Sequence, residues 1–225
     1  MQAAFYILRL GVLFGAISAF ALFSPLQADT LATDTDHKEV QIPSEFGYTN
    51  DALYFPGNPP KSNSKNIAVI LVHQYSSHKE SWIEFAQKLQ TKGITSLSIE
   101  DVGRRDVLDA IKFLASKDYH KVMLVGASMG GGSVLQASAQ SEGKVEKVVL
   151  LSTTSATAIT DPKIAKLFVV AKSDMWGSDS YSVFEETSDP KKIIEYDGFA
   201  HGQDLLTGEY GKEVTTLIID FLMTP

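Results

Sequence analysis

Residues 121–133 read KVMLVGASMGGGS, and the rest of the chain is organised around this stretch. Residues 122–125 form a short apolar run with β-branched residues at both ends, which is typical of a strand buried on both faces. Small residues follow as far as Gly132, and residues 134–139 can carry a helix. The pattern predicts a strand, a sharp turn with Ser128 at its tip, and then a helix.

Gly126, Ser128 and Gly130 form a Gly-x-Ser-x-Gly pattern, which between a strand and a helix is typical of a nucleophile elbow. A serine at the tip of such a turn must adopt a strained backbone, and its neighbours must be small so that strand and helix can approach closely. The free N–H groups and positive dipole end of the helix would face a negative oxygen formed there. Taken alone, the pattern also fits an incidental serine in a tight turn.

Other glycine-rich motifs fit this stretch less well. A phosphate-binding P-loop would need Lys where Gly132 stands. A dinucleotide-binding G-x-G-x-x-G fingerprint is broken at Ser128, which occupies the place of its second glycine. The glycines therefore favour neither phosphate nor dinucleotide binding.

The composition is that of an ordinary globular protein. The 225 residues, 44% hydrophobic and 21% charged, leave room for one domain with a sizeable core. The formal net charge is −7, and basic residues do not cluster beyond pairs such as Arg104 and Arg105, which argues against a nucleic-acid partner. Because there is no cysteine, a disulfide, a thiolate nucleophile and a Cys-ligated metal are excluded.

Residues 1–28 differ in kind from the rest. They contain no acidic residue and one basic residue, Arg9, followed by apolar, Gly and Ser residues over 10–23 and a small-residue cleavage pattern. This layout predicts a secretory signal peptide and a periplasmic or secreted protein. The alternative is an uncleaved anchor, which would be the protein's contact with a membrane. The polar, acidic residues 29–38 are predicted to be a linker, followed by one domain over 39–225.

Apolar runs and helical periodicities alternate along that domain. Strands are predicted over 40–42, 52–55, 67–72, 94–99, 122–125, 145–151, 164–170 and 193–196, and helices over 80–92, 107–114, 134–139 and 214–223. This alternation predicts an α/β protein with a mostly parallel central sheet and helices on both faces. In such sheets ligands bind at the carboxyl ends of the strands.

Ser128 needs a base to take its proton, and the base needs a carboxylate to orient it. Of the five histidines, His201 lies just beyond the carboxyl end of a predicted strand in a glycine-flanked loop, so it is the candidate base. Asp174 follows the predicted strand 164–170 and is the first candidate for the acid, with Asp161 in reserve.

From about residue 67 to its end the chain resembles the α/β-hydrolase family, in which the triad follows the same order of Ser, acid and His. Four segments carry the resemblance: 73–82 resembles the oxyanion loop, VGASMGG the elbow, VVAKSD the acid turn and GFAHG the histidine loop. The compact form is similar to dienelactone-hydrolase-like and small carboxylesterase branches, although the former commonly carry Cys in place of Ser128. Since only residues 152–163 separate two predicted strands, we expect no lid or a minimal one.

The resemblance implies Ser128, Asp174 and His201 as catalytic residues. It also implies an oxyanion hole made by the backbone N–H groups of Met129 and Tyr75.

The residue after His73 departs from the family pattern. The family usually has glycine there, and this chain has Gln74, so the shape of the loop and the N–H that points inward are open. The Gln74 side chain is an alternative donor, and His73 is expected to pack under the loop.

The expected activity is that of a serine hydrolase that cleaves a carboxylic ester of a small molecule through an acyl-enzyme, without metal or cofactor. Tyr75, Trp176 and Phe199 are candidates for apolar contacts with the substrate, and the alternative for each is ordinary core or loop packing. Amide or peptide hydrolysis by the same triad remains an alternative. So does a catalytically silent binding protein with the same fold, which Gln74 leaves open.

Overall fold

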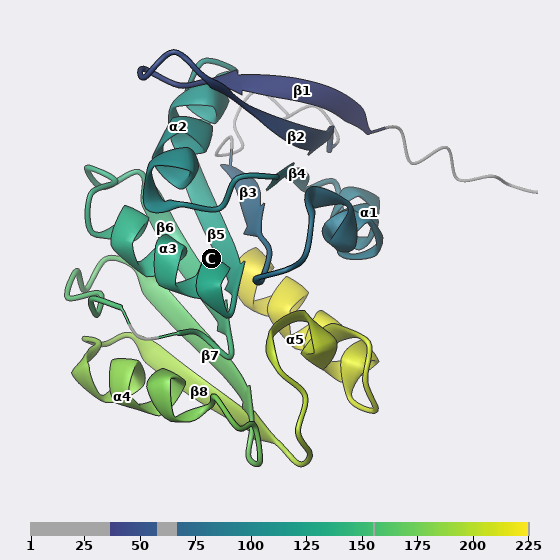
Figure 1. Ribbon diagram of the computed structural model, residues 1–225, viewed down its shortest axis with the longest axis vertical. Coiled ribbons are helices and arrows are strands. Elements are labelled where there is room, and N and C mark those ends of the chain that lie inside the picture. Colours follow the sequence, from purple (N-terminus) through teal and green to yellow (C-terminus); the bar gives the residue numbers. More distant parts are fainter. Residues whose placement is uncertain (1–36, 58–66, 155, 225) are drawn as a thin grey trace, which may run out of the picture. The chain divides into compact units, whose positions relative to one another are not determined.

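The computed structural model describes residues 37–57, 67–154 and 156–224, which form a sheet with helices on both faces (Figure 1). The predicted signal peptide, 1–28, lies outside the described residues, as does most of the predicted linker. Lys38, assigned above to the linker, is the first residue of β1. Within the described ranges, no helix has the length and apolar character needed to span a membrane.

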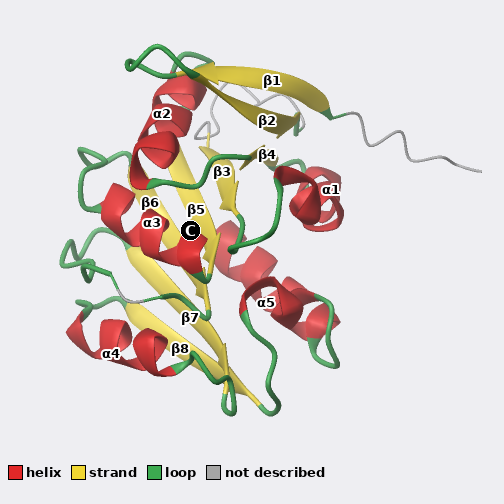
Figure 2. Ribbon diagram, viewed as in Figure 1, coloured by secondary structure: helices red, strands yellow, loops and turns green. Residues whose placement is uncertain are grey.

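Strands and helices alternate as the sequence predicts (Figure 2). The strands are β1 (Lys38–Pro43), β2 (Thr49–Phe55), β3 (Ile67–Val72), β4 (Thr95–Ile99), β5 (Lys121–Ala127), β6 (Val145–Leu151), β7 (Ala165–Ala171) and β8 (Lys191–Tyr196). The helices are α1 (Ile83–Thr91), α2 (Arg104–Ala115), α3 (Met129–Ser138), α4 (Ser178–Glu186) and α5 (Gly211–Met223), with 3₁₀ turns η1 (Lys79–Trp82) and η2 (Gly202–Leu206). The sequence analysis misses α4, since this short helix has no broad apolar stripe and its buried residues are Ser180 and Val183.

The strand order is β1-β2-β4-β3-β5-β6-β7-β8. β2 runs antiparallel to both of its neighbours, and the remaining neighbouring strands pair in parallel. β5, which carries the glycine-rich stretch at its end, pairs with β3 and β6 in the middle of the sheet. The loops after β3, β5, β7 and β8 therefore leave the sheet at the same edge.

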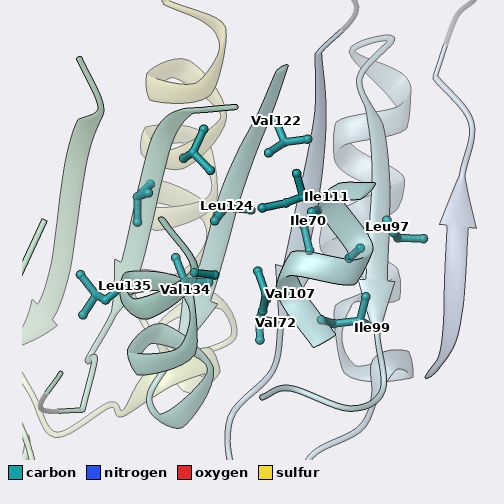
Figure 3. Close-up of a cluster of buried hydrophobic side chains, with 14 of the residues drawn as sticks. Ile70, Val72, Leu97, Ile99, Val107, Ile111, Val122, Leu124, Val134 and Leu135 are labelled. Atoms are coloured by element: carbon teal, nitrogen blue, oxygen red, sulfur yellow. The ribbon is translucent and has the colours of Figure 1, made fainter. Parts of the chain in front are cut away.

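The two faces of the sheet pack against different helices. Strand residues alternate between the faces, so that on β3 Ile70 belongs to one apolar cluster and Leu71 to the other. α2, α3 and α4 cover the first face, and α1 and α5 cover the second. Figure 3 shows the first cluster, in which Val107 of α2 and Val134 of α3 pack with Ile70 and Leu124 of the sheet. This double layer holds the strand ends, and the loops that follow them, in fixed positions.

Candidate active site

Ser128 is the single residue between the end of β5 and the start of α3. Its φ is 49° and its ψ is −117°, a positive φ that costs a non-glycine residue about 1–3 kcal/mol. The turn is held by the hydrogen bond from Ser128 N–H to the Leu151 carbonyl (2.9 Å) and by the bond from Thr154 N–H to the Ser128 carbonyl (3.2 Å). The predicted strain at the tip of the elbow is therefore confirmed.

The glycines around Ser128 allow α3 to lie directly on the sheet. A Cβ atom on Gly126 would lie 2.8 Å from the Cα atom of Gly131, and one on Gly130 would lie 2.5 Å from the Val72 carbonyl oxygen. Real Cβ atoms do not come so close, so these positions exclude side chains. The start predicted for this helix, residue 134, is wrong because the helix already begins at Met129, and the glycine run forms its first turn.

His201 joins Ser128 to Asp174 through two short hydrogen bonds. His201 Nε2 lies 2.8 Å from Ser128 Oγ, and His201 Nδ1 lies 2.8 Å from Asp174 Oδ2. The Asp174 side chain is fully buried, and its other oxygen accepts the Trp176 N–H at 3.0 Å. A carboxylate in this position requires the proton on Nδ1, which leaves the Nε2 lone pair facing the serine hydroxyl.

Asp161, the reserve candidate for the acid, lies elsewhere. Its carboxylate accepts the Lys163 N–H at 2.9 Å, and its carbonyl accepts the buried Lys166 ammonium at 3.0 Å. Both contacts are at the amino end of β7, whereas Asp174 follows the carboxyl end of that strand. The structure therefore brings Asp174, and not Asp161, to His201.

Residues 73–78, here called the β3 loop, run beside the elbow. His73 is buried, and its Nδ1 and Nε2 atoms lie 2.8 Å from the carbonyl oxygens of Gln74 and Glu100, so it packs under the loop as expected. The amide oxygen of the Gln74 side chain accepts the Gln203 N–H at 2.7 Å. Sequence reasoning misses Gln203, because nothing local distinguishes it from any polar residue in a loop.

The far end of the β3 loop is fixed by Glu100, just beyond β4. Its carboxylate accepts the Lys79 N–H at 3.0 Å and faces His78 Nδ1 at 3.0 Å. Burial opposes ionisation of this carboxyl group. The Lys79 N–H, His78 and the charge of Lys79 nevertheless hold the pKa of Glu100 below its ordinary value.

Backbone N–H groups remain available in the residue after Ser128 and in the β3 loop. Within the described residues, the N–H groups of Met129 and Tyr75 have no hydrogen-bond partner in the protein, whereas the Gln74 N–H donates to Gln203 Oε1 at 3.2 Å. These two free groups are the donors that the sequence resemblance implies.

Solved structures of the same architecture include several hydrolases. Dienelactone hydrolase from Anabaena variabilis is 18% identical with a TM-score of 0.68, covering 84% of this chain and 97% of its own. Monoacylglycerol lipase from Paleococcus ferrophilus is 16% identical with a TM-score of 0.64, covering 77% and 98%. The esterase Pf2001 from Pyrococcus furiosus is 13% identical with a TM-score of 0.66, covering 84% and 91%. The chain has the α/β-hydrolase fold.

Neither a family model nor a curated protein matches the sequence. The likeness is thus one of α/β-hydrolase architecture, and it does not by itself assign an activity to the site.

Five large apolar side chains, here called the rim, are exposed in the segments that carry or flank Ser128, Asp174 and His201. The predicted contact residues Tyr75, Trp176 and Phe199 are 75%, 61% and 78% exposed, so they are not packed in the core. Met129 and Met175, which the sequence analysis does not single out as contacts, are 38% and 79% exposed. Each rim residue lies next to the elbow, in the acid turn, in the histidine loop or in the β3 loop. The rim is therefore exposed apolar surface.

The segment between β6 and β7, where larger members of the fold could carry a lid, contains no helix among its described residues. Its Ile159 is buried in the cluster beneath α2, α3 and α4, which directs the segment toward the core.

In the described part of the chain, no group of three or more His, Asp or Glu side chains is arranged to hold a metal ion.

Proposed function

We propose that this protein is a serine hydrolase that cleaves carboxylic esters of small molecules through an acyl-enzyme. The observation that carries the proposal is the continuous hydrogen-bonded series from Ser128 Oγ through His201 to Asp174, with both contacts at 2.8 Å. The strained backbone of Ser128 supports it, because strain of this kind persists where function requires a fixed geometry. The esterases and the lipase that share the fold support ester substrates.

In the first half of the reaction, His201 Nε2 takes the proton of Ser128 Oγ as this oxygen attacks the ester carbonyl. The carbonyl oxygen becomes an oxyanion, which the N–H groups of Met129 and Tyr75 stabilise. Met129 opens α3, so the positive end of the helix dipole favours the same charge. The C–O bond to the alcohol then breaks, and His201 delivers its proton to the departing oxygen.

In the second half, water replaces the alcohol. His201 Nε2 takes a proton from the water as its oxygen attacks the acyl-serine, and returns that proton to Ser128 Oγ when the carboxylic acid leaves. Asp174 stabilises the imidazolium in both halves and keeps its own charge throughout. The buried position of Asp174 strengthens this interaction, since little water screens it.

The experiment that tests this proposal combines covalent labelling with turnover. Wild-type protein should react with a fluorophosphonate probe and hydrolyse p-nitrophenyl acetate, and Ser128→Ala should lose both by about 10⁴-fold or more. Ser133→Ala, in the same helix and outside the triad, is the matched control and should keep both activities. A Ser128→Ala variant with a tenth of the wild-type rate would overturn the assignment.

The same experiment separates the alternatives. Hydrolysis of p-nitroanilides at rates comparable with the esters would show that the triad acts on amides. A folded protein that neither reacts with the probe nor turns over either substrate would be a binding protein with a silent triad.

We also propose that the protein is exported, on the basis of residues 1–28 alone.

A further inference from the structure

Gln74 and Gln203 hydrogen-bond to each other in both directions. The Gln203 N–H donates to Gln74 Oε1 at 2.7 Å, and the Gln74 N–H donates to Gln203 Oε1 at 3.2 Å. The two residues lie 129 positions apart, in the β3 loop and in η2 directly after His201. The pair therefore connects the β3 loop to the segment that follows His201.

The Gln203 side chain also reaches the other end of the β3 loop. Its Nε2 donates to Ser81 Oγ at 2.8 Å, and Ser81 Oγ donates in turn to the His78 carbonyl at 2.6 Å. Gln203, a residue only 8% exposed, thus holds the loop at Gln74 directly and at His78 through Ser81. Tyr75, whose N–H is free, lies between these two attachment points.

Gly202 gives the pair the space that it needs. Gly202 has a φ of +56°, and a Cβ atom there would collide with Gln74 Oε1. The Gln74 amide therefore lies against the backbone of the residue that follows His201. A displacement of the Gln74 amide would therefore displace the loop that carries His201. A displacement of Gln203 would in the same way displace the β3 loop.

We propose that Gln74 and Gln203 are positioning residues that keep the Tyr75 N–H and His201 Nε2 in register around Ser128. The inference rests on the proposed hydrolase function. The Gln74 N–H is occupied by Gln203, so the next N–H of the loop, that of Tyr75, is the first one free to bind an oxyanion. Gln74, at the position where the α/β-hydrolase family that the sequence resembles usually has glycine, then positions the site.

A pair that only stabilised the fold would behave differently from one that positions the site. Loss of a purely structural bond lowers the melting temperature and leaves kcat of the folded fraction unchanged. Loss of positioning lowers kcat, because a displacement of about 1 Å at a reacting group costs up to ~10²-fold, while KM changes much less.

The test uses Gln74→Met, Gln203→Met and the double variant, in which a side chain of similar length lacks the amide. With p-nitrophenyl acetate we expect kcat of each single variant to fall by about 10- to 100-fold in folded protein. Each single variant removes one of the two bonds between Gln74 and Gln203 and leaves the other, so the double variant should be slower than either single variant. Fluorophosphonate labelling should slow in parallel.

Gln90→Met is the matched control, since Gln90 donates its amide to the Pro56 carbonyl (2.9 Å) at the end of α1, away from the triad. It should keep wild-type kcat. Circular dichroism checks that each variant is folded, and Gln203→Ala replaces Gln203→Met if the latter does not fold.

Wild-type kcat in folded Gln203→Met, or in the folded double variant, would overturn the proposal. Either result, combined with a dead Ser128→Ala variant, would leave the hydrolase function standing. Full activity of Ser128→Ala would instead remove the function on which the inference rests.

Discussion

The indole ring of Trp176 meets the imidazole of His201 nearly edge to face, with centroids 5.1 Å apart and planes inclined by 61°. The backbone N–H of Trp176 also donates to Asp174 Oδ1 at 3.0 Å, so one residue contacts both partners of Ser128. The Trp176 side chain is nevertheless 61% exposed. Trp176 is therefore a rim residue whose ring is held in place by direct contact with His201.

Trp176→Ala should lower kcat/KM by about 2- to 10-fold, because an edge-to-face aromatic contact contributes ~0.5–1.5 kcal/mol. Trp176→Phe should keep most of the activity. Phe46→Ala removes another exposed aromatic ring, one that contacts Arg105, and should change nothing. Steady-state hydrolysis of p-nitrophenyl acetate measures all three variants, and equal values for Trp176→Ala and wild type would contradict the prediction.

Asp174→Asn should lower turnover by roughly 10⁴-fold, as expected when an orienting carboxylate is replaced by an amide. Asp161→Asn should stay close to wild type, since its carboxylate accepts the Lys163 N–H near the opposite end of β7. Parallel measurement of kcat in the two variants checks the assignment, and the reverse ranking would move the acid to the turn before β7.

Glu100→Gln should make the stability of the protein less sensitive to acid. Because its pKa in the fold lies below the ordinary value of 4.5, ionised Glu100 stabilises the folded state above that pH, and this contribution disappears as pH falls through the lower pKa. At about pH 7 the free energy of unfolding of the variant should be lower than that of the wild type by on the order of 1 kcal/mol, which corresponds to about 2–4 °C in Tm. At about pH 3 this difference between variant and wild type should be smaller.

Thermal unfolding at both pH values measures this effect. Glu84→Gln is the control, because its carboxylate is 79% exposed in a surface pair with Lys88. If the stability difference between Glu100→Gln and wild type grew in acid, the predicted direction of the pH dependence would be wrong.

Short acyl chains, of roughly two to six carbons, should be preferred, with a shallow dependence on length. Each methylene buried against a wall is worth ~0.8 kcal/mol, or about fourfold in rate, and an exposed rim gives less than this. A p-nitrophenyl ester series measures the dependence. Since the described residues between β6 and β7 form no helix to close over Ser128, we also expect no jump in rate when the substrate forms micelles. A steep rise toward long chains would reveal a covered acyl site.

The mature chain should begin at or near Asp29 and be found outside the cytoplasmic membrane. Mass analysis of the protein purified from its native source measures the N-terminus. Recovery of protein that still contains Met1 in the membrane fraction would establish the anchor instead.

Local sequence patterns were sufficient to predict the elbow and the order of the strands. The apolar run before Ser128 favours a buried strand, and the glycines after it allow a helix to pack closely on that strand. Both effects involve residues that are close in the sequence, so the sequence alone could predict them. The positions of Asp174 and His201 directly after predicted strands were also readable, because parallel strands end at one edge of the sheet.

Tertiary structure decided the contacts between distant residues. The choice of Asp174 over Asp161 depends on which end of β7 faces His201, and the pairing of Gln74 with Gln203 depends on two loops meeting across the end of the sheet. The early start of α3 likewise follows from its packing on β5, since glycine is a poor helix former and only close contact with the sheet favours it there. A hydrogen bond is specified by distance and angle within a few tenths of an ångström, and sequence spacing carries no such information for residues that only the folded sheet brings together.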